Sequence, residues 1–303
     1  MSANANVTID VHHVTRVEGH GNIRINVRNG VLEECRLDIV ESPRFFEAML
    51  IGRPYTEAHH ITCRICGICS VGHTLASLQA SEAALGVKVS DQTTLLRKIA
   101  LHGETLQSHV LHAYYLAAPD FVGVGSVLPL AATHLPVVQR ALRLKKLAND
   151  LCAVVVGRHV HPISTAVGGF TNVPDLKKLR EVQARLMAAR EDFRETVELF
   201  KALAGKIPAF ERKTEYISLK RDDEYAYLNG DIFSSQAGRT VSDNYRAMTN
   251  EYIVAHSSAK HCKATADSYQ VGALARFNNN HAQLRPEAQK VAEALGLKAM
   301  VCQ

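Results

Sequence analysis

Three cysteines and a histidine lie close together in residues 63–73, which read CRICGICSVGH. Cys66 and Cys69 form a Cys-x-x-Cys pair with Gly67 between them, so a single turn of the chain can bring two thiolates to one metal ion. Thiolates are soft ligands that suit zinc, nickel and iron. The spacing alone leaves three possibilities open: half of a zinc site, a redox-active dithiol, or ligands for another metal.

Neither of the first two possibilities finds support elsewhere in the chain. A structural zinc site needs four ligands, and no second Cys-x-x-Cys pair exists because the remaining cysteines are scattered at positions 35, 152, 262 and 302. A zinc site made from Cys63, Cys66, Cys69 and His73 would be cramped. A redox dithiol is expected at a strand-to-helix turn of a βαβ unit, whereas the sequence around this pair predicts helices.

Composition indicates an ordinary globular protein. Of the 303 residues, 47% are hydrophobic and 21% are charged, and the net charge is +5. The positive charge is spread along the chain without a basic block, so we do not expect a nucleic-acid partner. No run approaches the roughly 20 apolar residues of a membrane span. The polar start MSANANVTID has no leader pattern, which favours a cytoplasmic location.

The pattern of apolar residues predicts an α+β fold, a mainly helical body with a small N-terminal antiparallel sheet. Residues 7–40 alternate around the Asn29-Gly30 turn signal and predict a hairpin, with a further strand near the N-terminus. Ser90 is the expected N-cap of the third of the predicted helices, and residues 208–260 read as mixed and rich in loops. Helices are expected at residues 44–52, 72–86, 90–120, 134–157, 175–205 and 286–300.

A longer motif is more specific than the Cys-x-x-Cys pair. RICGICSVGH follows the form Arg-x-Cys-Gly-x-Cys-x-x-x-His and resembles the N-terminal metal motif of nickel-iron hydrogenase large subunits. VTRVEGHGNIRI at 14–25 is similar to the Arg-x-Glu-Gly-His segment of that family, and SPRFFE at 42–47 is similar to its magnesium-binding segment. RHVHP, VGGF and HSSAK resemble later segments. The resemblance runs in order along nearly the whole chain and is nearest to the cytoplasmic branches, which serve heterodisulfide reductase complexes, a deazaflavin or NAD(P).

The resemblance implies a role for each residue of the cysteine motif. Cys66 would be a terminal nickel ligand, and Cys69 would bridge nickel and iron. His73 would donate a hydrogen bond to the bridging sulfur. Arg64 would supply positive charge beside an anionic cluster. Simple surface or helix packing is the alternative for His73 and Arg64.

Two carboxylates outside the motif are also implied. Glu18 would accept the proton that heterolytic H2 cleavage releases and relay it to water, with His20 as a hydrogen-bonding support. An ion pair between Glu18 and Arg16 is the alternative. Glu47 would bind Mg²⁺ as a hard oxygen ligand, and an exposed helical glutamate is the alternative for that position.

For the chain as a whole, the resemblance implies reversible oxidation of H2 to protons and electrons. The implied cofactors are a nickel-iron centre, with cyanide and carbon monoxide on iron, and Mg²⁺. The implied partners are an iron–sulfur small subunit and further electron-transfer subunits, since this chain has no cysteine set for clusters of its own. We expect one large-subunit domain over residues 1–303, β-rich at 1–42 and mainly helical at 43–303.

The sequence departs from the family in two places. The motif Asp-Pro-Cys-x-x-Cys-x-x-His, which supplies the second pair of nickel ligands, is not found in the 303 residues. The chain as given is therefore expected to carry two of the four ligands. Ser108 stands where periplasmic members have an aspartate. These departures leave a rival open, a non-catalytic subunit related to the quinone-site subunit of respiratory complex I, although such relatives lack the cysteine pair.

Overall fold

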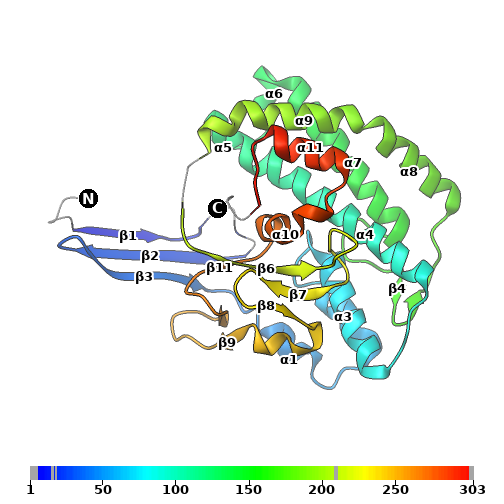
Figure 1. Ribbon diagram of the computed structural model, residues 1–303, viewed down its shortest axis with the longest axis horizontal. Helices are drawn as coiled ribbons and strands as arrows, with labels where there is room; N and C mark the ends of the chain where they lie inside the picture. The colour runs from blue at the N-terminus through cyan, green and yellow to red at the C-terminus, as the bar shows by residue number, and fades with distance from the viewer. Residues whose placement is uncertain (1–5, 15–16, 18, 208–210, 300–303) are drawn as a thin grey trace. The chain divides into compact units, whose positions relative to one another are not determined.

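The computed structural model describes residues 6–14, 17, 19–207 and 211–299. The chain forms two compact units. The first combines the N-terminal 52 residues with residues 249–264, and the second combines residues 53–248 with the remainder. Figure 1 shows a small sheet in the first unit and most of the helices in the second. The predicted α+β class is therefore confirmed, whereas the expectation of a single domain stays a prediction.

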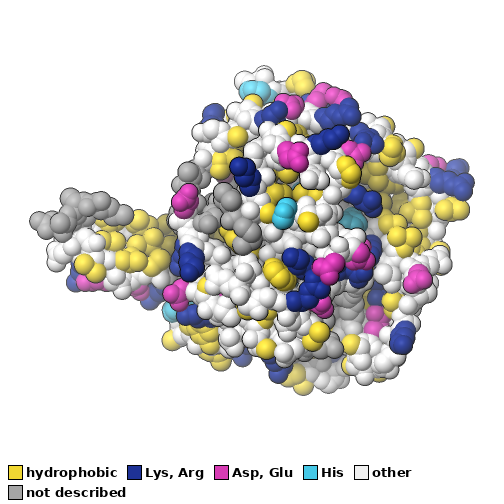
Figure 2. Space-filling model, in the orientation of Figure 1, with side chains coloured by type: hydrophobic (Ala, Val, Ile, Leu, Met, Phe, Trp, Pro, Cys, Tyr) yellow, Lys and Arg dark blue, Asp and Glu magenta, His cyan; other side chains and the backbone are white. Residues whose placement is uncertain are grey.

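The first unit is built on the predicted N-terminal sheet. Its strands β1 (Val7–Val11), β2 (Gly21–Arg28) and β3 (Val31–Ile39) pair antiparallel in the order β1-β2-β3. The turn between β2 and β3 has positive φ at both Asn29 (50°) and Gly30 (76°), as a two-residue hairpin turn requires. Because side chains alternate along a strand, one face is apolar, and Figure 2 shows hydrophobic side chains over this sheet.

Two short segments complete the first unit. Helix α1 (Phe45–Leu50) follows β3, in agreement with the predicted helix at 44–52. Strands β9 (Asn250–Tyr252) and β10 (His261–Lys263) pair with each other. The Ser258 N–H donates to the Ile39 carbonyl oxygen at 2.9 Å. This bond ties residues from the far end of the sequence to β3.

The predicted helices of the second unit are largely confirmed. Helix α2 (Tyr55–Thr62) precedes α3 (Ser70–Leu85), which ends at Gly86 with a φ of 67°. Helix α4 (Asp91–Val110) begins at the predicted N-cap, where the Ser90 hydroxyl accepts a hydrogen bond from the Thr93 N–H. It continues through the π-helical turn η1 (Leu111–Ala117) into α5 (Ala118–Val122). After the short α6 (Leu130–Thr133), helix α7 (Leu135–Val156) ends at Gly157.

The single helix predicted at 175–205 is wrong in one respect, because the chain forms two helices there. Helix α8 (Leu176–Ala188) starts at the N-cap Asp175, and α9 (Arg190–Leu203) follows a break at Ala189. No glycine or proline causes this break. Beyond the break, the Thr196 hydroxyl on α9 lies 2.6 Å from the hydroxyl of the buried Tyr114, a contact between residues 82 positions apart.

Residues 211–299 contain a four-stranded sheet and a helix that the sequence did not predict. Strands β6 (Glu215–Lys220), β7 (Asp231–Ser234), β8 (Gly238–Thr240) and β11 (Tyr269–Gln270) form a sheet in the order β11-β6-β7-β8. Helix α10 (Ala273–Asn280) packs on β6. Helix α11 (Pro286–Ala294) matches the predicted last helix.

Earlier in the chain, strands β4 (Thr165–Ala166) and β5 (Gly169–Phe170) follow α7 and pair with each other.

The core of the second unit lies where α3, α4 and α7 pack together. Gly103 on α4 allows the close approach, because a Cβ there would lie 2.9 Å from the Cys152 sulfur on α7. Fully buried core residues include Leu78, Ala100, Leu144, Cys152 and Val156. Among the residues described, no helix is both long and apolar enough to cross a membrane.

A buried ion pair joins α3 to α4. The Arg97 guanidinium donates two bonds to the Glu82 carboxylate, at 2.8 and 2.6 Å. Both side chains are buried, at 2% and 5% exposure. The Gly168 N–H also donates to Glu82 at 2.8 Å. This carboxylate therefore joins α3, α4 and the loop between β4 and β5.

We expect Glu82→Ala to lower the free energy of unfolding of the second unit by about 3–5 kcal/mol, because it leaves a buried guanidinium without its partner. Glu57→Ala is the control, since Glu57 forms an exposed ion pair with Arg53 at 3.7 Å and such pairs contribute about 0–1 kcal/mol. Denaturant unfolding followed by helical circular dichroism measures both. Equal losses in the two variants would contradict a structural role for the buried pair.

Candidate metal centre

The cysteine pair lies in the turn that leads into α3. Helix α2 ends at Thr62, and Cys69 is the N-cap of α3. Cys66 is buried and Cys69 is exposed. The Cys69 N–H points back to the Cys66 sulfur at 3.3 Å. The turn therefore brings the two predicted metal ligands together.

His161 contacts this turn through its ring and its backbone. Its Nδ1 lies 2.9 Å from the Cys63 carbonyl oxygen, and its backbone N–H donates to the Ser70 hydroxyl at 2.8 Å. His161 has a positive φ of 54°, which is uncommon for a residue other than glycine. The RHVHP segment thus lies beside the cysteine motif. Sequence reasoning noted this segment but assigned His161 no role.

Glu104 is the second residue that sequence reasoning missed. It projects from α4, is 6% exposed, and accepts hydrogen bonds from the N–H groups of Val71 at 2.5 Å and Gly72 at 2.9 Å. These N–H groups belong to the first turn of α3, where the helix has unpaired donors and partial positive charge. A glutamate at helical spacing carries no local signal for such a contact, because the partner lies 32 residues away in the chain.

Burial is the main cause of the pKa shifts of Glu104 and Cys69. Loss of hydration raises the pKa of Glu104 to about 7, against the opposing effect of its two N–H donors. The pKa of Cys69 is raised to about 12, first because packed atoms remove part of the hydration of the thiol, although the residue stays exposed, and then by Cys66 and Glu104. Since metals bind the thiolate, metal binding at this turn must release protons.

Arg64 and His73 flank the turn. Arg64 is exposed, and its charge acts on Cys63, where it partly offsets the rise in thiol pKa that burial causes. His73 lies one helical turn after Cys69, and its N–H donates to the Cys69 carbonyl oxygen at 3.1 Å. Burial lowers the pKa of the His73 ring, so the imidazole is neutral at pH 7 and can donate one N–H. The structure therefore places both residues in the motif without testing their predicted roles.

The four-ligand zinc hypothesis is not supported by this geometry. Cys63 is buried, and its thiol donates to the His60 carbonyl oxygen at 3.2 Å. Within the described part of the chain, no group of three or more His, Cys, Asp or Glu side chains is arranged to hold a metal ion. Two adjacent thiols remain, and they fit a metal site whose other ligands come from outside these residues.

Of the two carboxylates predicted outside the cysteine motif, the structure describes Glu47. Glu18 lies outside the described residues. His20, expected to support it, is 3.1 Å from a Glu41 carboxylate oxygen. Glu47 is exposed on α1, and Lys260 bonds its Oε1 at 3.0 Å and so holds the Glu47 pKa below its usual value. Lys260 also forms an ion pair with Glu251, in which its Nζ lies 3.2 Å from Glu251 Oε2.

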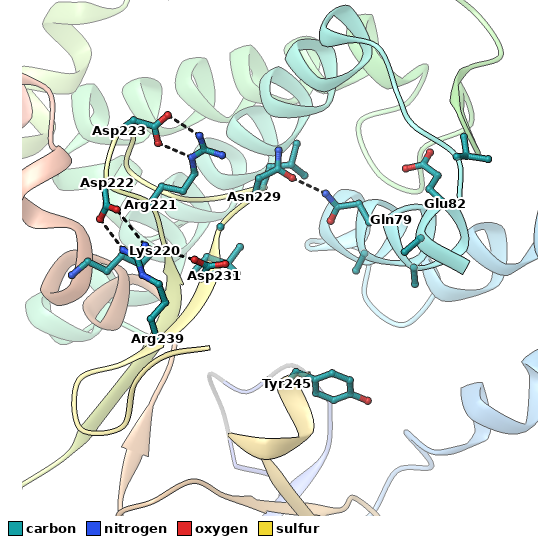
Figure 3. A pocket seen from close by; sticks show the side chains of 17 residues that line it. Gln79, Glu82, Lys220, Arg221, Asp222, Asp223, Asn229, Asp231, Arg239 and Tyr245 are labelled. Atoms are coloured by element: carbon teal, nitrogen blue, oxygen red, sulfur yellow. Dashed lines mark hydrogen bonds and ion pairs between the residues drawn. The ribbon is translucent and has the colours of Figure 1, made fainter. Parts of the chain in front are cut away.

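A large open cleft of about 1220 Å³ lies elsewhere in the second unit, between α3 and the strands β6 to β8. Figure 3 shows ion pairs among its arginine and aspartate side chains. Arg221 pairs with Asp223, and Arg239 pairs with Asp222, each at 2.7 Å. No cysteine is among the residues that line this cleft. The paired charges offer no excess charge for a ligand, so the cysteine turn stays the candidate site.

Comparison with known sequences identifies the family. A family model described as "Nickel-dependent hydrogenase" matches residues 44–135, and one described as "HoxL-like" matches residues 8–42. Sulfhydrogenase 1 subunit alpha of Pyrococcus furiosus is 33% identical over 96% of this chain and 68% of its own length. Sulfhydrogenase 2 subunit alpha of the same organism is 32% identical over 94% of this chain and 66% of its length. The chain thus spans about two thirds of the length of these relatives.

Solved structures agree. An NAD+-reducing [NiFe]-hydrogenase in the H2-reduced state matches 91% of this chain and 67% of its own, with a TM-score of 0.81 and 28% identity. The [NiFeSe]-hydrogenase of Dm. baculatum shares the fold over 97% of this chain and 72% of its own, with a TM-score of 0.73. These matches do not favour the complex I alternative. The cysteine turn and the matches along the sequence lead to the same conclusion: this chain belongs to the nickel-dependent hydrogenase family, as a large-subunit sequence.

Proposed function

We propose that this chain forms the part of a nickel-iron hydrogenase large subunit that supplies one pair of thiolate ligands, and that the assembled enzyme oxidises H2 reversibly. The observation that carries the proposal is the Cys66–Cys69 turn at the start of α3, where two interacting thiols stand on one turn. Soft thiolates suit nickel and iron. The nickel-iron centre, when bound, would supply the two-electron redox chemistry on H2.

The residues of the turn would divide the binding of the centre between them. Cys66 is buried and its sulfur accepts a backbone N–H, which suits a terminal ligand of nickel. Cys69 is exposed and would bridge nickel and iron. The neutral His73 ring, one turn further along α3, would donate its N–H to the bridging sulfur. Arg64 would add positive charge beside the anionic ligand set.

Carboxylates would serve the proton and the second metal. Glu18 would accept the proton from the site and pass it toward water. Glu47 would bind Mg²⁺, an ion that takes one or two carboxylates together with water. The ion pair between Glu47 and Lys260 means that Mg²⁺ must replace the ammonium group or share the carboxylate with it.

The partners and the location follow from the same proposal. Electrons would leave to an iron–sulfur small subunit and to further electron-transfer subunits in the cytoplasm. Cyanide and carbon monoxide would complete the coordination of iron. Similarity to an NAD+-reducing enzyme and to sulfhydrogenase subunits supports a cytoplasmic branch of the family and leaves the electron acceptor open.

Replacing either predicted ligand tests the metal site directly. Loss of a group that hydrogen-bonds a metal ligand lowers metal affinity by about 10–100-fold. We expect Cys66→Ser and Cys69→Ser, each in the assembled protein, to lower nickel retention by more than this, because each variant removes a ligand itself. Cys63→Ser is the matched control, because this buried thiol donates to the His60 carbonyl oxygen rather than joining the cysteine pair, so this variant should keep its nickel. Nickel and iron are measured by elemental analysis. Loss of nickel in Cys63→Ser with retention in Cys69→Ser would reverse the assignment.

The proton role of Glu18 predicts a variant that holds metal but reacts slowly. We expect Glu18→Gln to lower H2/D2 exchange by about 10²–10⁴-fold, the usual contribution of general acid–base catalysis, with nickel content unchanged. Glu34→Gln, on strand β3, is the control. Unchanged exchange in a nickel-loaded Glu18→Gln enzyme would exclude Glu18 from the proton path.

The magnesium role of Glu47 can be separated from its ion pair. Glu47 and Glu251 both bind Lys260, so Glu47→Gln and Glu251→Gln each remove one partner of the same lysine. We expect only Glu47→Gln to lower the Mg²⁺ content of the assembled enzyme. If the two variants retain equal Mg²⁺, the role of Glu47 is the ion pair alone.

A further inference from the structure

The start of α3 is capped in an unusual way. An N-cap side chain normally accepts a hydrogen bond from the second or third N–H of its helix. Cys69 is the N-cap, yet its side chain makes no such bond. The N–H groups at those positions belong to Val71 and Gly72, and both donate to Glu104 instead. A carboxylate from another helix thus takes the place of the N-cap side chain.

Glu104 is held firmly in this place. It lies next to Gly103, where α4 approaches α7 closely, and it is buried. In the described ranges, no Lys or Arg forms an ion pair with it. Its counter-charge is the positive end of α3. Gly72 leaves space for it, since a Cβ at this position would lie 3.2 Å from Glu104 Oε2.

As a result, the two sulfurs of the pair differ. The Cys66 sulfur accepts the Cys69 N–H at 3.3 Å, whereas the Cys69 sulfur accepts no N–H from the first turn of its helix. Hydrogen bonds to a metal-bound sulfur withdraw electron density from it and tune the redox potential of the site. A thiolate sulfur that bridges two metals uses two of its three lone pairs, so one remains for a single donor such as the His73 ring, and backbone N–H groups would compete for it.

We propose that Glu104 is a positioning residue of the metal site, which takes the backbone N–H groups of Val71 and Gly72 so that they do not bond the Cys69 sulfur, which stays available to bridge two metals. This inference rests on the proposed function. In the absence of the carboxylate, we expect the Cys69 sulfur to accept a hydrogen bond from one of these two N–H groups, as an N-cap side chain does. The sulfur then donates less electron density to the metals.

The experiment compares Glu104→Gln and Glu104→Ala in the assembled enzyme. Glutamine keeps one acceptor oxygen and alanine keeps none. The carbon monoxide and cyanide stretching bands of the iron report electron density at the metal, so we expect them to move to higher wavenumber in the order wild type, Gln, Ala. Nickel retention should fall by about 10–100-fold in Glu104→Ala, as for other residues that orient a ligand. Hydrogen exchange of the peptide that contains Val71 and Gly72 is followed in the same samples.

Two further variants make the test decisive. Thr105→Val changes the neighbouring residue on α4, whose hydroxyl bonds only within its own helix, and should leave the bands unchanged. Gly72→Ala favours the helix but crowds the carboxylate, so it should move the bands in the same direction as Glu104→Gln even if the Glu104 variants fail to fold.

The possible failures are distinguishable. If the wild-type enzyme lacks carbon monoxide and cyanide bands, the proposed function itself fails and this inference fails with it. If the wild type has the bands and they stay in place in Glu104→Ala and Gly72→Ala, Glu104 is only a helix cap and this inference alone is wrong. Unchanged exchange of the Val71 and Gly72 amides in Glu104→Ala would show that the contact itself does not exist, which also overturns the inference.

Discussion

The first turn of α3 is the constraint on which the candidate site depends. Helix N–H groups without partners are costly to bury, and here two of them meet a buried carboxylate from α4. That carboxylate lies on α4, which packs closely on α7 at Gly103 and is joined to α3 by the Arg97–Glu82 pair. The cysteine turn is therefore tied to the packing of these three helices.

The same burial explains the protonation of the site. Loss of hydration raises the pKa values of the buried Glu104 carboxyl and of the Cys69 thiol, which is partly desolvated although the residue is exposed. The neutral thiol is the stable form of Cys69 in the absence of a cation, and a bound metal converts it to the thiolate. A carboxylate and two thiolates in one small region repel one another, so this arrangement is compatible with a strongly positive occupant at the cysteine pair.

The alternatives differ in how they treat the two thiols. A zinc scaffold requires four convergent ligands, whereas Cys63 bonds a carbonyl of α2 and does not join the pair. A non-catalytic relative has no need for Cys66 and Cys69, or for a capping arrangement that directs the first N–H groups of α3 to Glu104. The Cys66 sulfur accepts the Cys69 N–H, whereas the Cys69 side chain does not cap its own helix, and this difference agrees with the proposed terminal role of Cys66 and bridging role of Cys69.

The sequence by itself determined the cysteine motif, the N-terminal hairpin and most helix ends, because each depends on neighbouring residues: a Cys-x-x-Cys spacing, Asn29-Gly30 at a turn, Ser90 at an N-cap, Gly86 and Gly157 after helices. Tertiary structure decided the break at Ala189 and the pairing of β6 with β11, where the partners are distant in the chain. It also decided that Glu104 and His161 meet the cysteine turn. Their roles come from burial and from contacts across 30 to 100 positions, and local periodicity carries no information about either.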